Sequence, residues 1–133
     1  MKVVFDTNIF ISGLMWRGAP YRCLLASLAG LVELVVSSPI LDELRRTLAT
    51  KFGFTDEEIE QVVGVVRESA SLVEIRGELK VVADDPEDDK FIETAHVAGA
   101  AYVVSGDRHL LSVGSYGEIR IVSARVFLDM LAG

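Results

Sequence analysis

The feature that most constrains the fold is an alternation of short apolar segments with helical segments along the whole chain. Clusters of β-branched, aliphatic and aromatic residues predict strands at 2–5, 31–36, 72–75, 101–104 and 119–122. Strands that are apolar at most positions and separated by helices are typical of a parallel sheet with both faces covered. We therefore predict an α/β fold around a central parallel sheet, whose strand order the pattern does not reveal.

The helical segments carry recognisable start and end signals. Ser38-Pro39 is a typical helix start, and Thr55 with Glu58 has the spacing of a capping box. Glycines stand at the expected helix ends, at positions 30, 53 and 99. Helices are predicted at 9–15, 21–29, 40–51, 55–69, 88–98, 107–111 and 123–131.

The length and the hydropathy limit the class of protein. A chain of 133 residues has the size of one domain, so we predict a single domain over residues 1–133. No apolar run approaches the roughly twenty residues of a membrane-spanning helix. The first acid stands at position 6, which leaves no room for the apolar stretch of a signal peptide, so we expect a cytoplasmic protein. Cys23, the only cysteine, is predicted to be a small core residue.

The formal net charge of −7 argues against a general nucleic-acid coat protein, which neutralises phosphates with a basic surface. It does not argue against a nuclease. Acidic side chains that hold divalent cations present positive charge to a phosphate, so the local charge can oppose the global one.

Four acids from four separate segments are predicted to meet at one edge of the sheet. Asp6 and Asp107 follow predicted strands, whereas Glu43 and Asp89 lie in or near the first turns of helices. Ligands of open α/β sheets bind at this carboxyl edge. Glu43, Asp89 and Asp107 each have an ordinary explanation as a helix cap or a solvated charge, and this holds equally for Asp88. Asp6 is harder to explain in this way, because strand ends do not need carboxylates. Their convergence at one edge favours a shared function.

Carboxylates that converge without a counter-charge repel one another, and a divalent cation removes this cost. Ligands that are all oxygen suit Mg²⁺ or Mn²⁺, and the sequence has no His or Cys cluster typical of zinc or iron. We therefore give no metal role to His96 or His109. Metal-assisted hydrolysis of a phosphoester is the reaction that such a site predicts.

These segments together resemble the PIN domain family, and within it the toxins of toxin–antitoxin pairs related to VapC. The resemblance rests on Asp6-Thr7-Asn8 after an apolar strand, on Glu43, on the run from Asp88 to Ala95, and on Val104-Ser105-Gly106-Asp107. It covers essentially the whole chain in the right order. It implies a three-layer α/β/α sandwich of Rossmann-like type and a ribonuclease that depends on Mg²⁺ or Mn²⁺.

The resemblance also implies which residues form the site. The four acids of the family fall on Asp6, Glu43, Asp89 and Asp107. Asp6 and Asp89 would bind the principal metal ion, with Asp107 bound directly or through water. Glu43 would bind a second ion or orient the attacking water. Asp89 is preferred to its neighbour because the family acid stands two residues before the first apolar residue of the helix.

Two polar residues occupy the positions of supporting groups in the family. Asn8 and Ser105 would hold carboxylates and waters by hydrogen bonds. Attack on phosphorus by water should leave a 5′-phosphate and a 3′-hydroxyl. The basic residues proposed to grip the RNA backbone are Arg17, Arg22, Arg45, Arg46 and Arg108. The family further implies a cognate antitoxin and a homodimer as partners.

Three other functions compete with a ribonuclease. A phosphoryl-transfer domain of the receiver or haloacid-dehalogenase type also gathers acids at this edge, but Asn8 stands where a dehalogenase has a second Asp. A receiver would need an acid pair before the strand-end acid and a lysine after a late strand. A non-catalytic protein-binding module of the same fold would use its apolar surface instead. A nuclease directed at DNA is the third alternative, since only the family resemblance favours RNA.

Overall fold

The computed structural model describes residues 1–133 and has a six-stranded sheet with the order β3-β2-β1-β4-β6-β5. All neighbouring strands are parallel except the short β5, which pairs antiparallel with β6. The bounds are β1 Lys2–Phe5, β2 Glu33–Val36, β3 Ala70–Leu72, β4 Tyr102–Val104, β5 Ser115–Tyr116 and β6 Ile119–Val122. The predicted α/β fold with a central, mostly parallel sheet is therefore confirmed.

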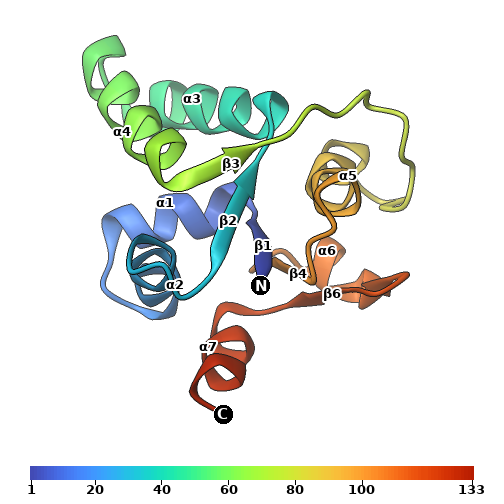
Figure 1. The fold of residues 1–133 in the computed structure, drawn as a ribbon. Coiled ribbons are helices and arrows are strands. Elements are labelled where there is room, and N and C mark those ends of the chain that lie inside the picture. Colours follow the sequence, from blue (N-terminus) through green and yellow to red (C-terminus); the bar gives the residue numbers. More distant parts are fainter.

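Helices cover both faces of this sheet, as Figure 1 shows. Helices α1, α2 and α7 lie on one side and α5 lies on the other. The bounds are α1 Thr7–Met15, α2 Ala19–Leu28, α3 Ser38–Phe52, α4 Asp56–Ser69, α5 Asp89–Ala98, α6 Arg108–Val113 and α7 Ala124–Ala132, with a 3₁₀ turn, η1, at Pro86–Asp88. One hydrophobic core joins the layers and includes Cys23, which is buried as predicted.

Several element boundaries differ from the sequence prediction for local reasons. The predicted strand 72–75 lies earlier, at Ala70–Leu72, because α4 ends at Ser69 and the chain pairs with β2 at once. Strand β5 was not predicted, since two residues are too few to make a strand pattern. The predicted capping box at the start of α4 is present, with reciprocal bonds between Thr55 and Glu58.

The ends of three neighbouring strands form one row at the carboxyl edge. Phe5 pairs with Val104, and Val104 pairs with Val122. The next residues continue this alignment, because Asp6 N–H donates to the carbonyl of Val104 over 3.1 Å and Ser105 N–H to that of Val122 over 3.0 Å. The sheet thus places Asp6 and Ser105 side by side.

The segment between β3 and η1 has no regular structure beyond single turns, and α5 holds it in place. The carboxylates of Asp89 and Glu93, one helical turn apart on α5, accept hydrogen bonds from five backbone N–H groups of this segment. Glu93 accepts from Arg76, Gly77 and Leu79 over 2.9 to 3.0 Å. We call residues 76–82 the strap. None of the helices is both long and apolar enough to cross a membrane.

Candidate metal centre

Asp6 lies at the end of β1 and is buried, with 3% of its surface exposed. One oxygen, Oδ1, accepts from Ile9 N–H over 2.9 Å and so caps α1, while Oδ2 accepts from the hydroxyl of Ser105. Burial raises the pKa of Asp6 to about 6, although these hydrogen bonds oppose the rise; the charge of Asp107 adds to it. The fold therefore buries a carboxyl group whose ionised form is destabilised by its surroundings.

Asp107 lies three residues beyond the end of β4 and is the N-cap of α6. Its Oδ1 accepts from His109 N–H over 2.7 Å, and its own N–H donates to the Ser105 hydroxyl over 2.9 Å. Ser105 therefore connects Asp6 and Asp107 at the ends of neighbouring elements. The capping explanation for Asp107 is correct, but it uses one carboxylate oxygen and leaves the other available.

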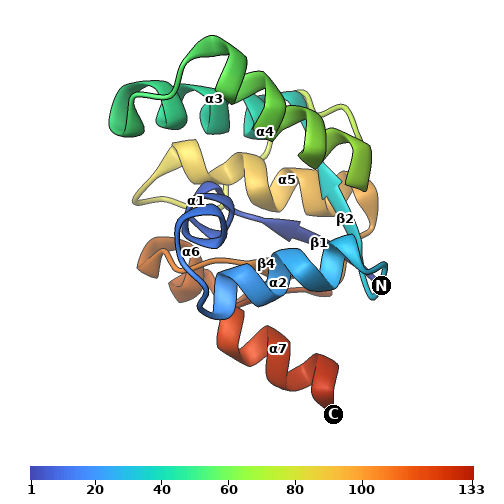
Figure 2. The ribbon, with the colours of Figure 1, turned by 90° about the vertical axis from the view of Figure 1, so that its left-hand side faces the viewer.

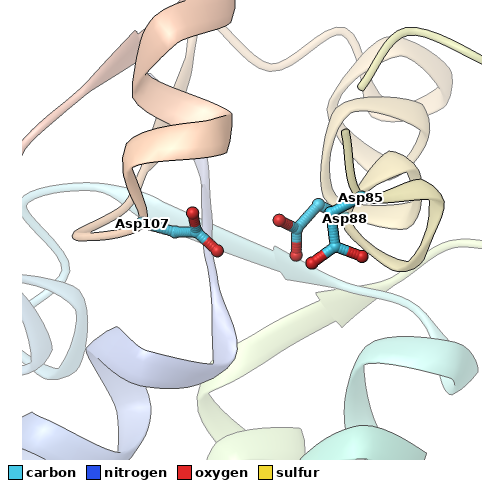
Figure 3. Close-up of side chains that lie close together, drawn as sticks. All are labelled: Asp85, Asp88 and Asp107. Atoms are coloured by element: carbon cyan, nitrogen blue, oxygen red, sulfur yellow. The ribbon is translucent and has the colours of Figure 1, made fainter. Parts of the chain in front are cut away.

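Asp88 and Asp85 face Asp107 from the other side, as Figure 3 shows. Carboxylate oxygens of Asp85, Asp88 and Asp107 lie within 4.8 Å of one another. Burial, followed by the charges of Asp107, Asp85 and Asp6, raises the pKa of Asp88 to about 7. Atom Oδ2 of Asp88 is buried and has no hydrogen-bond donor. Asp6 is not within this distance of all three, but its charge acts on Asp88 and that of Asp107 acts on it. We call the four residues together the acidic cluster: Asp6, Asp85, Asp88 and Asp107.

Asp89, which the sequence favoured over Asp88, has a different environment. Its Oδ1 accepts from Val81 N–H over 2.8 Å and from Val82 N–H over 2.7 Å, so this carboxylate holds the strap. The residue is 9% exposed. The structure thus places Asp88, and not Asp89, against Asp107. Two adjacent acids at the start of one helix have separate tasks here.

Glu43 lies on α3 and is engaged by two side chains. Its Oε1 accepts from Lys90 Nζ over 2.6 Å, and its Oε2 accepts from the hydroxyl of Thr7, the residue after Asp6. Lys90 also donates to the carbonyl of Glu87 over 2.7 Å. The ion pair between α3 and α5 therefore lies beside the acidic cluster, and Glu43 is not among the acids whose charges act on Asp88.

The other predicted residues lie around this site. Asn8 is exposed in the first turn of α1, and its side chain forms no hydrogen bond with the acids. His109 approaches Asp84, with Nδ1 and Oδ2 3.9 Å apart, whereas His96 packs edge-on against Tyr116. A hollow of about 670 Å³ lies between the strap and the start of α5. None of the four acids of the cluster lines it.

The acidic cluster fits a hard divalent cation. Carboxylate oxygens are the ligands that Mg²⁺ and Mn²⁺ prefer, and a cation would satisfy the unpartnered oxygen of Asp88. It would also offset the burial and the repulsion between carboxylates, which together raise the pKa values of Asp6 and Asp88. Sequence reasoning did not select Asp85. The sequence feature that could have located Asp85 is its position directly before Pro86, which is typical of the N-cap of a short helical turn.

Comparison with known proteins identifies the family and the fold of the chain. A model of a PIN domain family matches residues 2–109. The structure is similar to a chain of the crystal structure of VapBC2 from Rickettsia felis bound to a DNA fragment from their promoter. The TM-score is 0.64 at 15% identity, over 91% of this chain and 97% of that one, so this likeness concerns the fold. No curated protein sequence has a significant match to the chain.

Proposed function

Because the chain belongs to the PIN domain family, we propose that it is a metal-dependent endoribonuclease and the toxin of a toxin–antitoxin pair. The observation that carries this proposal is the acidic cluster, where one buried carboxylate oxygen of Asp88 has no partner within the protein. Most buried polar atoms have a hydrogen-bond partner, so an unpartnered carboxylate oxygen beside two other acids supports a bound ligand. A cation and the phosphate that it attracts meet this need.

In the proposed site, Asp6, Asp88 and Asp107 hold the principal ion, and Asp85 contributes from the rim. Mg²⁺ or Mn²⁺, when bound, would supply the Lewis acidity that makes water acidic enough to attack phosphorus and that stabilises the charge on the phosphate. Ser105 holds Asp6 in orientation through its hydroxyl, a supporting task that commonly matters ten- to a hundredfold for metal affinity. Asp89 supports the site indirectly by fixing the strap that leads to Asp85.

Glu43 keeps its proposed part in orienting the attacking water or binding a second ion. Its ion pair with Lys90 suits the first of these tasks, because one oxygen accepts from Thr7 beside Asp6 while Lys90 fixes the other. Lys90 itself would then place a positive charge near the phosphate. A second ion at Glu43 would require Lys90 to move away.

The experiment that tests the function is cleavage of an end-labelled single-stranded RNA with Mn²⁺ or Mg²⁺. Wild type should cut and leave 5′-phosphate ends, whereas Asp6→Asn and Asp88→Asn should not. Circular dichroism must show that both variants are folded. Cutting by wild type that equals cutting by Asp6→Asn would exclude this site. A folded wild type that binds no metal would favour the non-catalytic binding module.

We propose an antitoxin and a second copy of the chain as protein partners. The support is the family, the fold shared with the VapBC2 structure, and large apolar side chains that are exposed on α1 and α2, including Leu14 and Leu28. Sedimentation of the purified chain tests the homodimer. Co-expression with the product of an adjacent gene, followed by loss of RNA cleavage, tests the antitoxin.

A further inference from the structure

Three arginine side chains line one hollow of about 200 Å³ where α2 and α7 begin. They are Arg17, Arg22 and Arg125, and the only acid in the lining is Asp129. None of the three guanidinium groups forms an ion pair within the protein, whereas Arg45 pairs with two acids on the helix bundle of α3 and α4. In a chain with a net charge of −7, unpaired arginines gathered in one hollow point to an anionic ligand. We call this hollow the arginine pocket.

Aromatic side chains accompany these arginines. The Arg17 guanidinium lies over the ring of Tyr21, with 5.7 Å between Cζ and the ring centroid. Trp16, the only tryptophan, immediately precedes Arg17 and is 63% exposed. An exposed indole has no structural task here, and its burial would be favourable. Aromatic faces next to arginines are typical of surfaces that bind single-stranded nucleic acid, where bases stack while the cations hold phosphates.

The arginine pocket lies at the same edge of the sheet as the acidic cluster. The row of paired residues runs from the end of β1 through β4 to β6, and α7 starts directly beyond β6. The first turn of α7 carries Arg125, so this arginine lies beyond the end of β6, two strands along the sheet from β1 and Asp6. Figure 2 shows the starts of α2 and α7 together, at the end of the molecule where α6 lies.

The start of α2 adds to the attraction for an anion. Its N-cap is Gly18, which offers no side chain to the first N–H groups of the helix. These groups and the helix dipole favour a negative charge at this position. The N-terminus of α7, in contrast, has a side-chain cap, because the Ser123 hydroxyl accepts from Val126 N–H over 3.2 Å.

From this arrangement we propose that the arginine pocket binds a backbone phosphate of the single-stranded RNA whose scissile bond lies at the acidic cluster, with an adjacent base stacked on Trp16. This proposal rests on the proposed ribonuclease function and adds a direction to it. The strand runs along the carboxyl edge from the acidic cluster towards α7. Arg125 has this task although no sequence motif marks it.

Trp16 provides the measurement, since it is the only tryptophan and immediately precedes Arg17 of the pocket. An eight-nucleotide single-stranded RNA is titrated into the metal-free protein in EDTA at low salt, so that no cleavage occurs. The RNA should quench Trp16, and Arg22→Gln and Arg125→Gln should each weaken binding by roughly three- to tenfold. Each should also lower the slope of log affinity against log salt by about 0.7. The control is Arg67→Gln, an exposed arginine on α4.

The outcomes separate this proposal from the nuclease itself. Asp6→Asn should bind RNA at least as tightly as wild type in EDTA, because it removes a negative charge from the metal-free cluster, and it should fail to cut with Mn²⁺. Trp16→Ala should weaken binding of a fluorescein-labelled RNA, measured by anisotropy, by at least about fivefold. The pocket is overturned if RNA leaves Trp16 unquenched, if the pocket variants bind like Arg67→Gln, or if polyglutamate quenches Trp16 as well as RNA does. That last result would assign the pocket to an acidic peptide. Loss of cutting with intact quenching would instead count against the nuclease.

Discussion

The Ser105 hydroxyl donates to Oδ2 of Asp6 across the ends of β4 and β1, and the same oxygen atom of Ser105 accepts the N–H of Asp107. One small side chain thus links the two acids that the strand ends deliver. Its position follows from the register, because Ser105 continues the row in which Phe5 and Val104 pair. The serine orients the acids without being a ligand itself.

Ser105→Ala should therefore lower Mn²⁺ affinity by about ten- to a hundredfold while the protein stays folded. The variant leaves Oδ2 of Asp6 without its donor, so the carboxylate loses both orientation and a bond that favours its ionised form. Isothermal titration with Mn²⁺ measures the change. Ser123→Ala is the matched control, since Ser123 follows β6 as Ser105 follows β4 but only caps α7. Equal loss of affinity in both variants would contradict the role given to Ser105.

Asp88→Asn should stabilise the metal-free protein at pH 8. The pKa of Asp88 is raised to about 7, so the folded state binds its proton more tightly than the unfolded chain does. The free energy of unfolding therefore falls as the pH rises from about 4 to 7, and the full penalty remains above that range. The neutral variant avoids this penalty, and we expect a gain of roughly 1 to 2 kcal/mol at pH 8 that falls by more than half at pH 5 and disappears near pH 4.

Urea unfolding at the two pH values measures this difference. Asp84→Asn serves as the control, because the Asp84 side chain is 79% exposed and should show no such change. Addition of Mn²⁺ should make wild type the more stable of the two, because wild type binds the ion and the variant does not. A variant that is less stable than wild type at both pH values would show that Asp88 is not held under charge repulsion.

Asp89→Asn should lower stability while metal affinity is largely kept. The carboxylate of Asp89 accepts two backbone N–H groups of the strap, and hydrogen bonds to a charged group contribute about 1.5 to 3 kcal/mol. Urea unfolding with parallel Mn²⁺ titration compares it with Asp88→Asn. If Asp89→Asn abolishes metal binding and leaves stability unchanged, Asp89 is the ligand after all.

Glu93→Gln should weaken the strap, and most strongly at neutral pH. Burial alone would raise the pKa of Glu93, but the N–H groups of Leu79, Gly77 and Arg76 outweigh it, and the pKa is lowered. The ionised form therefore stabilises the fold above the pKa of the unfolded chain, near 4.5. This contribution is lost as the pH falls through the lower folded value. We expect a loss of about 2 kcal/mol at pH 7 that shrinks in acid.

Hydrogen exchange of the amides at 76, 77 and 79 gives the local measurement for this variant. These amides should exchange faster in Glu93→Gln, while those of the central strands keep their protection. Glu58→Gln is the matched control, because the pKa of Glu58 is also lowered but its partner is the local cap at Thr55. Unchanged exchange in the strap would mean that the strap is held by its apolar side chains instead.

The fold was predictable because buried positions produce regular patterns of apolar residues in the sequence, and because capping residues mark where the helices begin. The strand order was not, since it depends on contacts between segments far apart in the chain. The different surroundings of Asp88 and Asp89 could not be predicted, for a geometric reason. The 3₁₀ turn η1 ends at Asp88 and α5 begins at Asp89, so neighbouring side chains point in different directions at a junction that carries no sequence signature.

The candidate site was predictable only as an edge of the sheet. Asp6 and Asp107 were located because strands delivered them, whereas Asp85 belongs to an irregular segment whose path no periodicity describes. The pairing of Glu43 with Lys90 joins α3 to α5, and no spacing along the chain predicts such a contact. Ion pairs and loop positions depend on the assembled tertiary structure.

The strap has a consequence for how this protein can vary between relatives. Its grip uses backbone N–H groups at five positions, and these are present whatever side chain follows, with proline as the exception. The exposed side chains of Arg76, Glu78 and Lys80 can therefore change while Glu93 and Asp89 keep their hold on the strap. Val82 cannot change as freely, because its side chain is buried in the core, and Gly77 has a positive φ. A proline at 79 or 81 would remove one of the five N–H donors and so do more damage than a replacement at an exposed position.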